Sequence, residues 1–253
     1  MTAPVPLGRR VAAEAVGTAA LVAIVVGSGI QATELSRDVG VQLLANSLAT
    51  VFGLGVLIAL LGPVSGAHFN PVVSAAAWFT GRRTGDGLTL RDLAVYAPAQ
   101  IAGAVGGAVL ANAMFAEPLV KWSARDRSAG HLWLGELVAT SGLVLLVFGL
   151  ARSGRDRFAP VAVASWIGAA YWFTSSTSFA NPAVTIGRAF TDSFAGIAPA
   201  SLPAFVAAQI AGAVLGLALV AVLFGCSDPA AGDSVPAPAP AGEHELTAAT
   251  PGH

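Results

Sequence analysis

The sequence predicts an all-α membrane protein in which six membrane-spanning helices surround two short re-entrant half-helices, arranged as an inverted repeat. Three observations predict this fold. Of the 253 residues, 55% are hydrophobic and 11% are charged, whereas a soluble domain carries about 25% charged residues. Two Asn-Pro stretches begin apolar segments that are too short to cross a bilayer. The residues around them recur in both halves of the chain in the same order.

Six apolar segments are each near the roughly 20 residues that a spanning helix requires. They lie at roughly 11–30, 41–61, 93–114, 132–150, 159–177 and 203–225. The first follows Arg9 and Arg10 and resembles a signal peptide, but it extends over about 20 residues and matches a later segment, so we interpret it as a retained helix.

The two half-helices are expected near 70–80 and 181–191, between the second and third spans and between the fifth and sixth. Asn70 and Asn181 are good N-cap residues, and Pro71 and Pro182 suit the first helical position, where no N–H is needed. Irregular backbone at membrane depth is tolerated only where protein or a water-filled cavity surrounds it. The pair therefore indicates a pore.

The two halves of the chain repeat one another. Residues 99–105 (AQIAGAV) are identical to residues 208–214, and Glu14 and Glu136 begin matching patterns in the first span of each half. Three spans per half give the second copy the opposite polarity, so the half-helices should approach from opposite faces and meet near the midplane. We expect a channel domain at 1–226, with repeats at about 8–115 and 130–226. The Pro/Ala-rich tail at 227–253 is expected to be disordered.

The basic residues predict the orientation, because cytoplasmic ends of membrane proteins carry an excess of Lys and Arg. One side of the predicted topology carries Arg9, Arg10, Arg82, Arg83, Arg91, Arg152, Arg155 and Arg157, and the other carries Arg37, Lys121, Arg125 and Arg127. Both termini should therefore be cytoplasmic, in an inner or plasma membrane. The net charge of −1 does not indicate a nucleic-acid partner.

Residues 65–71 (SGAHFNP), together with Asn181-Pro182-Ala183 and the matched Glu14 and Glu136, resemble the aquaporin or major intrinsic protein family from residue 8 to about 225. The resemblance implies a channel of six helices and two half-helices that passes small neutral solutes passively. It also implies a homotetramer with one pore per subunit and no cofactor. We find no catalytic triad, metal cluster or phosphate loop, so we do not expect an enzyme.

The half-helix starts, Asn70-Pro71-Val72 and Asn181-Pro182-Ala183, are the predicted centre of the pore. Each N-terminus presents unpaired N–H groups and the positive end of a helix dipole, which repels cations, and each Asn amide can donate a hydrogen bond to a passing oxygen. The alternative is that both Asn residues are only N-caps.

Five further polar residues are expected to support or form the pore loops. Glu14 and Glu136 are carboxylates at membrane depth, where a charge is costly. The resemblance implies that they accept hydrogen bonds from the loops, and the alternative is proton transport. Gln100 and Gln209 are expected to bond loop carbonyls, and His68 to fix a loop or line the pore rather than bind a metal.

The selectivity filter that the resemblance implies falls on Thr50, Gly168 or Ala169, Ser178 and Val184. Water and glycerol channels have Arg after the second Asn-Pro-Ala, but here Val184 holds that place. A filter without an aromatic or a cation should be wide. This combination resembles a bacterial branch linked to arsenic resistance, which passes neutral arsenous acid, so arsenous acid and glycerol are the expected solutes, with some water.

Arg188 lies seven residues beyond Asn181, on roughly the same helical face. One hypothesis places it in the outer vestibule as a substitute for the missing filter arginine; the other pairs it with Asp192. Three alternatives to a channel for metalloids or polyols also remain open. They are a water-selective aquaporin, a transporter that uses Glu14 or Glu136 to carry protons, and a formate-like anion channel.

Overall fold

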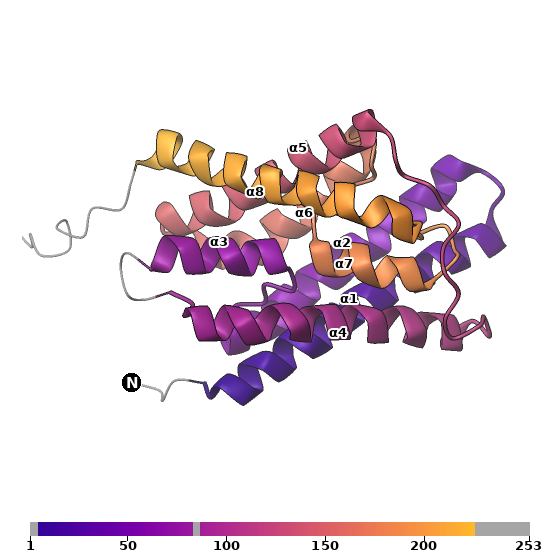
Figure 1. The fold of residues 1–253 in the computed structure, drawn as a ribbon, viewed down its shortest axis with the longest axis horizontal. Helices are drawn as coiled ribbons and strands as arrows, with labels where there is room; N and C mark the ends of the chain where they lie inside the picture. The colour runs from indigo at the N-terminus through magenta and orange to yellow at the C-terminus, as the bar shows by residue number, and fades with distance from the viewer. Residues whose placement is uncertain (1–4, 83–86, 226–253) are drawn as a thin grey trace, which may run out of the picture.

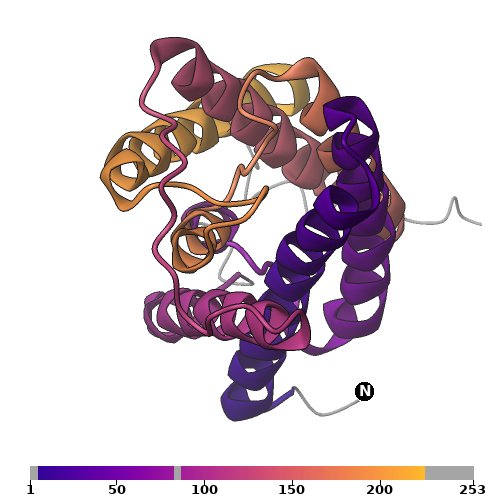
Figure 2. The ribbon, with the colours of Figure 1, turned by 90° about the vertical axis from the view of Figure 1, so that its right-hand side faces the viewer.

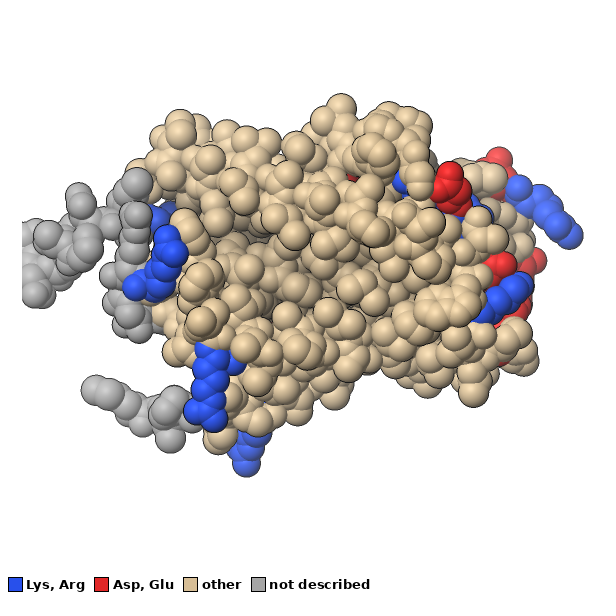
Figure 3. Space-filling view, in the orientation of Figure 1, with Lys and Arg blue, Asp and Glu red and all other residues tan. Residues whose placement is uncertain are grey.

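The structure is a computed structural model that describes residues 5–82 and 87–225. Its long helices run roughly along one axis, and the charged side chains visible on one face lie towards the two ends, which leaves a broad uncharged band between them (Figures 1 and 3). The expected tail at 227–253 and Arg83 lie outside the described residues.

The first repeat contains four helices: α1 Leu7–Leu35, α2 Val39–Ser65, α3 Pro71–Gly81 and α4 Leu90–Met114. Local capping explains where several of them begin. The Asp38 side chain accepts from the N–H of Val41 at the start of α2, and Thr89 and Asp92 form a capping box at the start of α4. Helix α2 ends at Gly66, whose φ of 91° is left-handed, so the chain turns there toward the centre of the molecule.

The second repeat contains α5 Gly130–Arg152, α6 Ala159–Phe173, α7 Pro182–Gly187 and α8 Leu202–Phe224. Three short 3-10 helices adjoin them: η1 Asp156–Phe158, η2 Arg188–Phe190 and η3 Pro199–Ser201. Five of the described helical segments are long and apolar enough to span a membrane. The sixth, α6, ends at Phe173 after 15 residues, four residues earlier than the sequence predicted, because the chain becomes extended at Thr174.

The two repeats are packed in the same way. In α4, Gly103 and Gly107 lie so close to α1 that a Cβ on either would meet a backbone oxygen of α1 at 2.2 or 2.1 Å. In α8, a Cβ on Gly212 or Gly216 would likewise meet a backbone oxygen of α5, at 2.5 or 2.6 Å. Small residues that let helix backbones touch are the usual basis of helix packing in lipid, so these glycines set the geometry of both halves.

The half-helices α3 and α7 lie end to end, as the repeat predicted. Viewed along the long helices, α7 lies in front of α3 and the longer helices surround the pair (Figure 2). Helix α7 packs mainly against α4, and α3 against α4 and α8. The N-termini of α3 and α7 therefore face each other inside the protein, which is where the candidate site lies.

Candidate functional site

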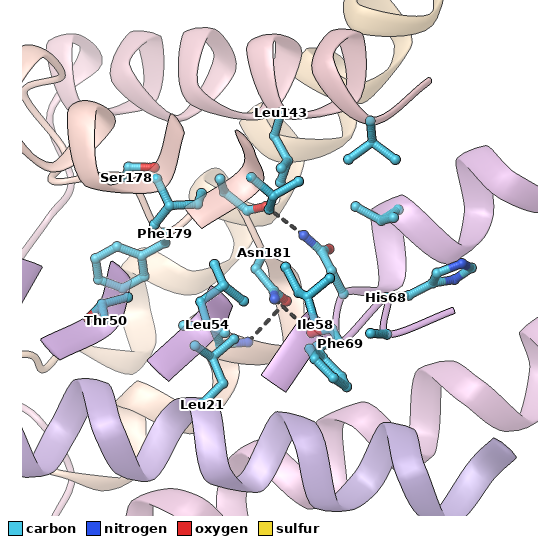
Figure 4. A pocket seen from close by; sticks show the side chains of 18 of the residues that line it. Leu21, Thr50, Leu54, Ile58, His68, Phe69, Leu143, Ser178, Phe179 and Asn181 are labelled. Carbon is cyan, nitrogen blue, oxygen red and sulfur yellow. Dashed lines mark hydrogen bonds between the residues drawn. The ribbon is translucent and has the colours of Figure 1, made fainter. Parts of the chain in front are cut away.

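Asn70 and Asn181 meet at the centre of the protein through reciprocal hydrogen bonds. The Asn70 amide donates to the carbonyl of Ala180 and the Asn181 amide to the carbonyl of Phe69, both at 2.8 Å (Figure 4). Each side-chain oxygen caps its own half-helix: Asn70 Oδ1 accepts from Val72, and Asn181 Oδ1 accepts from Ala183 and Val184. Because an amide has two N–H protons, each Asn retains one for a solute.

The loops that lead into the half-helices have strained backbone. Left-handed φ angles of +48 to +60° occur in residues other than glycine at Ala67 and Phe69 in the first loop and at Thr177, Ser178 and Ala180 in the second. Such conformations persist only where the surroundings enforce them, and they gather at functional sites. Hydrogen bonds to two buried carboxylates provide that enforcement.

Glu14 holds the first loop. Its Oε1 accepts from the Ser65 hydroxyl at 2.6 Å and from the backbone N–H of His68 at 3.0 Å. Its Oε2 accepts from the N–H of Phe69 and from Gln100 Nε2, each at 2.7 Å. The loop contacts that the resemblance implied are therefore present, and the carboxylate is fully enclosed by donors.

Glu136 holds the second loop in the same way. Its two oxygens accept from the N–H groups of Phe179 and Ala180, both at 2.8 Å, and from Gln209 Nε2 at 2.6 Å. Because both oxygens of Glu136 already accept hydrogen bonds from the loop and from Gln209, the arrangement favours a structural role over the proton-carrier hypothesis.

The prediction for the two glutamines was wrong about their partners. Besides bonding the glutamates, Gln100 Nε2 donates to the hydroxyl of Ser74 at 3.0 Å and Gln209 Nε2 to that of Thr185 at 2.8 Å. The loop carbonyls are not their acceptors because the loop residues present N–H groups, not oxygens, to the glutamates. Ser74 and Thr185 each stand four residues after the Asn, so the network repeats by symmetry.

A cavity of about 160 Å³ runs past the two asparagines, and one water requires roughly 10–15 Å³. Figure 4 shows it in close-up. Its lining combines aliphatic side chains with the loop residues: Leu21, Val25, Thr50, Leu54, Ile58, Gly66, Ala67, His68, Phe69, Asn70, Val73, Leu143, Val147, Ala159, Val163, Ile167, Tyr171, Ser178, Phe179, Ala180, Asn181, Val184 and Arg188.

His68 lines this cavity, as expected. Its Nδ1 is 3.0 Å from the Ser74 hydroxyl, and its ring packs edge-on against Tyr96 with centroids 6.0 Å apart. No cluster of three His, Cys, Asp or Glu side chains that could hold a metal occurs in residues 5–82 and 87–225. His68 is therefore placed by the pore loop, with its ring at the cavity wall.

The filter predicted at 168 or 169 was placed incorrectly. A Cβ on Gly168 would meet Val51 at 2.4 Å, so this position faces α2, and Ala169 is exposed on the outer surface. Tyr171 lines the cavity instead, with its hydroxyl 3.2 Å from that of Thr50. The ambiguity in loop length misplaced the assignment by two or three residues, which on a helix turns a side chain to another face.

The cavity beside Thr50 is therefore lined by an aromatic, whereas the filter expected from the sequence had none. The Thr50 hydroxyl donates to the carbonyl of Asn46 at 2.8 Å, so it can only accept from Tyr171. The phenol oxygen of Tyr171 then remains an acceptor for a solute. One sequence signal for this residue was available: Tyr171 is the single aromatic with a hydroxyl in its span.

Ser178 and Val184 also line the cavity at the positions expected of them. The hydroxyl of Ser178 is buried and has no hydrogen-bond partner within residues 5–82 and 87–225. A buried hydroxyl without a partner costs free energy, and this cost is relieved if a solute bonds it. Val184, 5% exposed, offers a methyl surface where the resemblance expected an arginine.

Arg188 reaches the same cavity, and the predicted pair with Asp192 was wrong. Its guanidinium lies 3.4 Å from the centre of the Phe179 ring, and its Nε donates to the carbonyl of Ala195. Asp192 instead pairs with Lys121 at 3.3 Å and accepts from the N–H of Ala124. The chain turns sharply after η2, which carries Asp192 away from the i+4 position that a continued helix would give it.

A second arginine that the sequence analysis did not assign to the site lies on Phe179. Arg127 has its guanidinium 4.9 Å from the ring centre and donates to the carbonyls of Gly196 and Ser176. Burial and the nearby charge of Arg125 lower the pKa of Arg127 to about 10, so it remains cationic at neutral pH. The outer part of the cavity is thus bordered by positive charge.

The outer loops are tied together by two carboxylates. The N–H of Ala124, and then Lys121, hold the pKa of Asp192 below its usual value, and hydrogen bonds from Ser128 and Ser201 do the same for Asp126. Both carboxylates are therefore charged at neutral pH, and they fasten the segment between α4 and α5 over the end of α7.

Comparison with known proteins gave consistent matches. The family model described as "Major intrinsic protein" matches residues 2–179. The aquaglyceroporin AqpS of Rhizobium meliloti (strain 1021) is 48% identical over 234 residues, which are 92% of this chain and 98% of that protein. The glycerol uptake facilitator protein of Bacillus subtilis (strain 168) is 28% identical over 162 residues, 57% of this chain and 55% of the relative, or about half of its length.

Among solved structures, the X-ray structure of the aquaglyceroporin from Plasmodium falciparum matches with a TM-score of 0.60 at 22% identity. The match covers 85% of this chain and 96% of the other. The likeness supports the fold described above.

Proposed function

This chain belongs to the major intrinsic protein family and forms a membrane channel for small neutral solutes, and we propose that its preferred solutes are small polyhydroxyl molecules, glycerol or arsenous acid, with some water. We further propose that it works as a homotetramer in an inner or plasma membrane, with both termini in the cytoplasm. The seven described arginines at the end where α1 begins and α5 ends, against four basic residues on the opposite loops, support this orientation.

The observation that carries the proposed solute class is the hydroxyl of Ser178, which has no partner among the described residues and lies in a cavity that also presents the Thr50 and Tyr171 hydroxyls and the Asn70 and Asn181 amides. Ser178 can donate and accept, Tyr171 can accept, and Asn70 and Asn181 each have a free amide proton. A solute with several hydroxyls can exchange hydrogen bonds with these groups in sequence, while its apolar side passes the methyl groups of Val184. A polyol and arsenous acid both meet this description.

The absence of a bulky cation at position 184 favours solutes larger than water. Arginine in the place of Val184 would narrow the filter, and it would add five fixed donors on a planar group. The aromatic ring of Tyr171 also lines the cavity, so the filter is less open than the sequence analysis suggested. We infer that the pore admits a solute about the size of glycerol rather than a larger sugar.

Stopped-flow light scattering of proteoliposomes, run in parallel with water, glycerol and arsenous acid, tests the proposal. We expect all three to enter faster than into empty liposomes. In Val184→Arg, the entry rates of glycerol and arsenous acid should fall roughly tenfold or more, which corresponds to about 1.4 kcal/mol. The entry rate of water should fall less. Conduction of water alone by the wild type would favour a water-selective channel and overturn the assignment.

A further inference from the structure

A hollow larger than the pore cavity lies away from the pore, between α3 and α8. It has a volume of about 690 Å³ and is bordered by α3 from Val72 to Thr80, by α8 from Ile210 to Ala221, and by Arg152 at the end of α5. The two helices run side by side on the face shown in Figures 1 and 3. Its other lining side chains are mostly small or aliphatic, with Trp78 and Phe79 at one end.

The inverted repeat shows that α3 is packed less closely than its counterpart α7. In the second half, Gly187 packs α7 against α4 so tightly that a Cβ there would lie 2.7 Å from the Ala104 backbone. The symmetry-related positions in the first half are Ala76, six residues after its Asn, and Ala213. The methyl of Ala76 packs on Ala213, and it prevents α3 from approaching α8 as closely.

The length of the hollow matches one leaflet of a bilayer. Along α8 it extends from Ile210 to Ala221, about 16 Å at a rise of roughly 1.5 Å per residue. The hydrocarbon core of a membrane is about 30 Å thick. The inner end lies beside Val72, close to the central asparagines, so the hollow extends from the midplane to one surface of the membrane.

Two arginines lie at the membrane-surface end of the hollow, on the side that the proposed orientation makes cytoplasmic. Arg152 borders the hollow and donates to the carbonyl of Gly225, and Arg82 lies over the ring of Phe79, 3.9 Å from its centre. Both are exposed, and neither forms an ion pair with another described residue. Long cationic side chains at the end of an apolar surface place their charge at the membrane interface, where phosphates lie.

We propose that this hollow binds one acyl chain of an anionic phospholipid from the adjacent leaflet, with the lipid phosphate held by Arg82 and Arg152. The apolar lining accepts the chain, and the two guanidinium groups supply the charge complementary to the headgroup. The bound chain shields the outward face of α3, a half-helix that otherwise meets loosely packed lipid near the pore centre. This proposal does not depend on which solute the channel conducts.

Native mass spectrometry of the purified protein with phosphatidylglycerol or phosphatidylcholine of identical chains tests the proposal. We expect the wild type to retain phosphatidylglycerol in preference. Arg82→Gln combined with Arg152→Gln should weaken that retention by about fivefold per arginine. Arg157→Gln, which removes an exposed charge at the same end but outside the hollow, should leave retention unchanged. Equal retention of both lipids by the wild type would overturn the proposal.

A second pair of variants tests the hollow itself. Ala218→Trp places a large side chain in it, whereas Ala211→Trp makes the same change at an exposed position of α8 outside it. We expect Ala218→Trp alone to remove one bound phosphatidylglycerol. A change in the number of subunits instead would mean that a second copy covers this face, and an unchanged lipid count would mean that the lipid binds elsewhere. Either result rejects the proposal.

Discussion

Arg188 is a buried cation without a carboxylate partner in the described chain. It is 3% exposed and rests on the face of Phe179. A guanidinium on an aromatic face is stabilised by the ring quadrupole while it keeps its charge. Val184, one turn further in, leaves the position expected of a filter arginine uncharged. We infer that Arg188 supplies the positive potential that excludes cations, from a place where it does not narrow the filter.

Replacements of Arg188 test whether its charge excludes cations without restricting the size of the solute. Arg188→Gln should raise the leak of sodium or potassium ions by about thirtyfold, because a unit charge at about 8 Å and an effective dielectric of 20 contributes about 2 kcal/mol. Arg188→Lys should retain exclusion, and glycerol uptake should change little in either. Ion flux into proteoliposomes measures the leak, with Arg157→Gln as the control. A cation leak in Arg188→Gln that is no larger than in the wild type would contradict this role.

The residues that sequence analysis could place are those fixed by local chemistry. Asn70 and Asn181 each precede a proline and begin a helix, so the pattern predicted both caps. Tyr171 could not be placed, because the packing of α6 against α2 decides which face of α6 meets Thr50. The partner of Arg188 was missed for a similar reason. The accepting carbonyl of Ala195 lies beyond the turn that follows η2, and no helical spacing describes that turn.

The short helix α7 depends on one glycine. Gly187 lies against the Ala104 backbone, whereas its counterpart in α3 is Ala76. Helix α7 carries both Asn181 and Val184, so any displacement of α7 moves the centre of the pore and the filter together. The geometry of the cavity therefore depends on the close contact between α7 and α4.

Substitution at these symmetry-related positions should have unequal effects. Gly187→Ala places a methyl 2.7 Å from the α4 backbone and should cost about 1–3 kcal/mol through overpacking, together with most of the conduction. Ala76→Gly should cost about 1 kcal/mol and leave conduction close to wild type. Thermal unfolding in detergent and stopped-flow swelling measure both. Similar losses in the two variants would show that the α7–α4 contact has no special role.

The contacts of Asp192 in the outer loops stabilise the protein in a pH-dependent way. Because the N–H of Ala124 and Lys121 lower the pKa of Asp192 from its usual 3.8, the stabilisation is complete above that value and is lost as pH falls through the lower folded pKa. Asp192→Asn should reduce the melting temperature by at most a few degrees at pH 5–7. The difference from wild type should vanish below the folded pKa. A difference that disappears already near pH 6 would identify another group as the cause.

Across the full channel, the order of elements followed from the sequence because each repeat carries its landmarks in the same order. Glu14, Asn70 and Gln100 occur in the same order as Glu136, Asn181 and Gln209. In the structure each glutamine donates to the glutamate of its own repeat, and each asparagine donates to the loop of the other repeat. The C-terminal end of α6 and the hollow beside α3 did not follow, since they depend on how closely neighbouring backbones approach.

The same networks predict that transport needs no ion gradient. Glu14 and Glu136 already accept hydrogen bonds on both oxygens, and the described residues that line the cavity include no carboxylate. A proton carrier requires a group that is loaded on one side and unloaded on the other, and neither glutamate can exchange its donors without releasing a strained loop. Glycerol should therefore equilibrate across proteoliposomes at the same initial rate with or without a pH difference of two units. Accumulation above the external concentration, or a rate that follows the imposed gradient, would establish coupled transport instead. Empty liposomes under the same gradient provide the baseline, so that solute leak through lipid is subtracted before the two rates are compared.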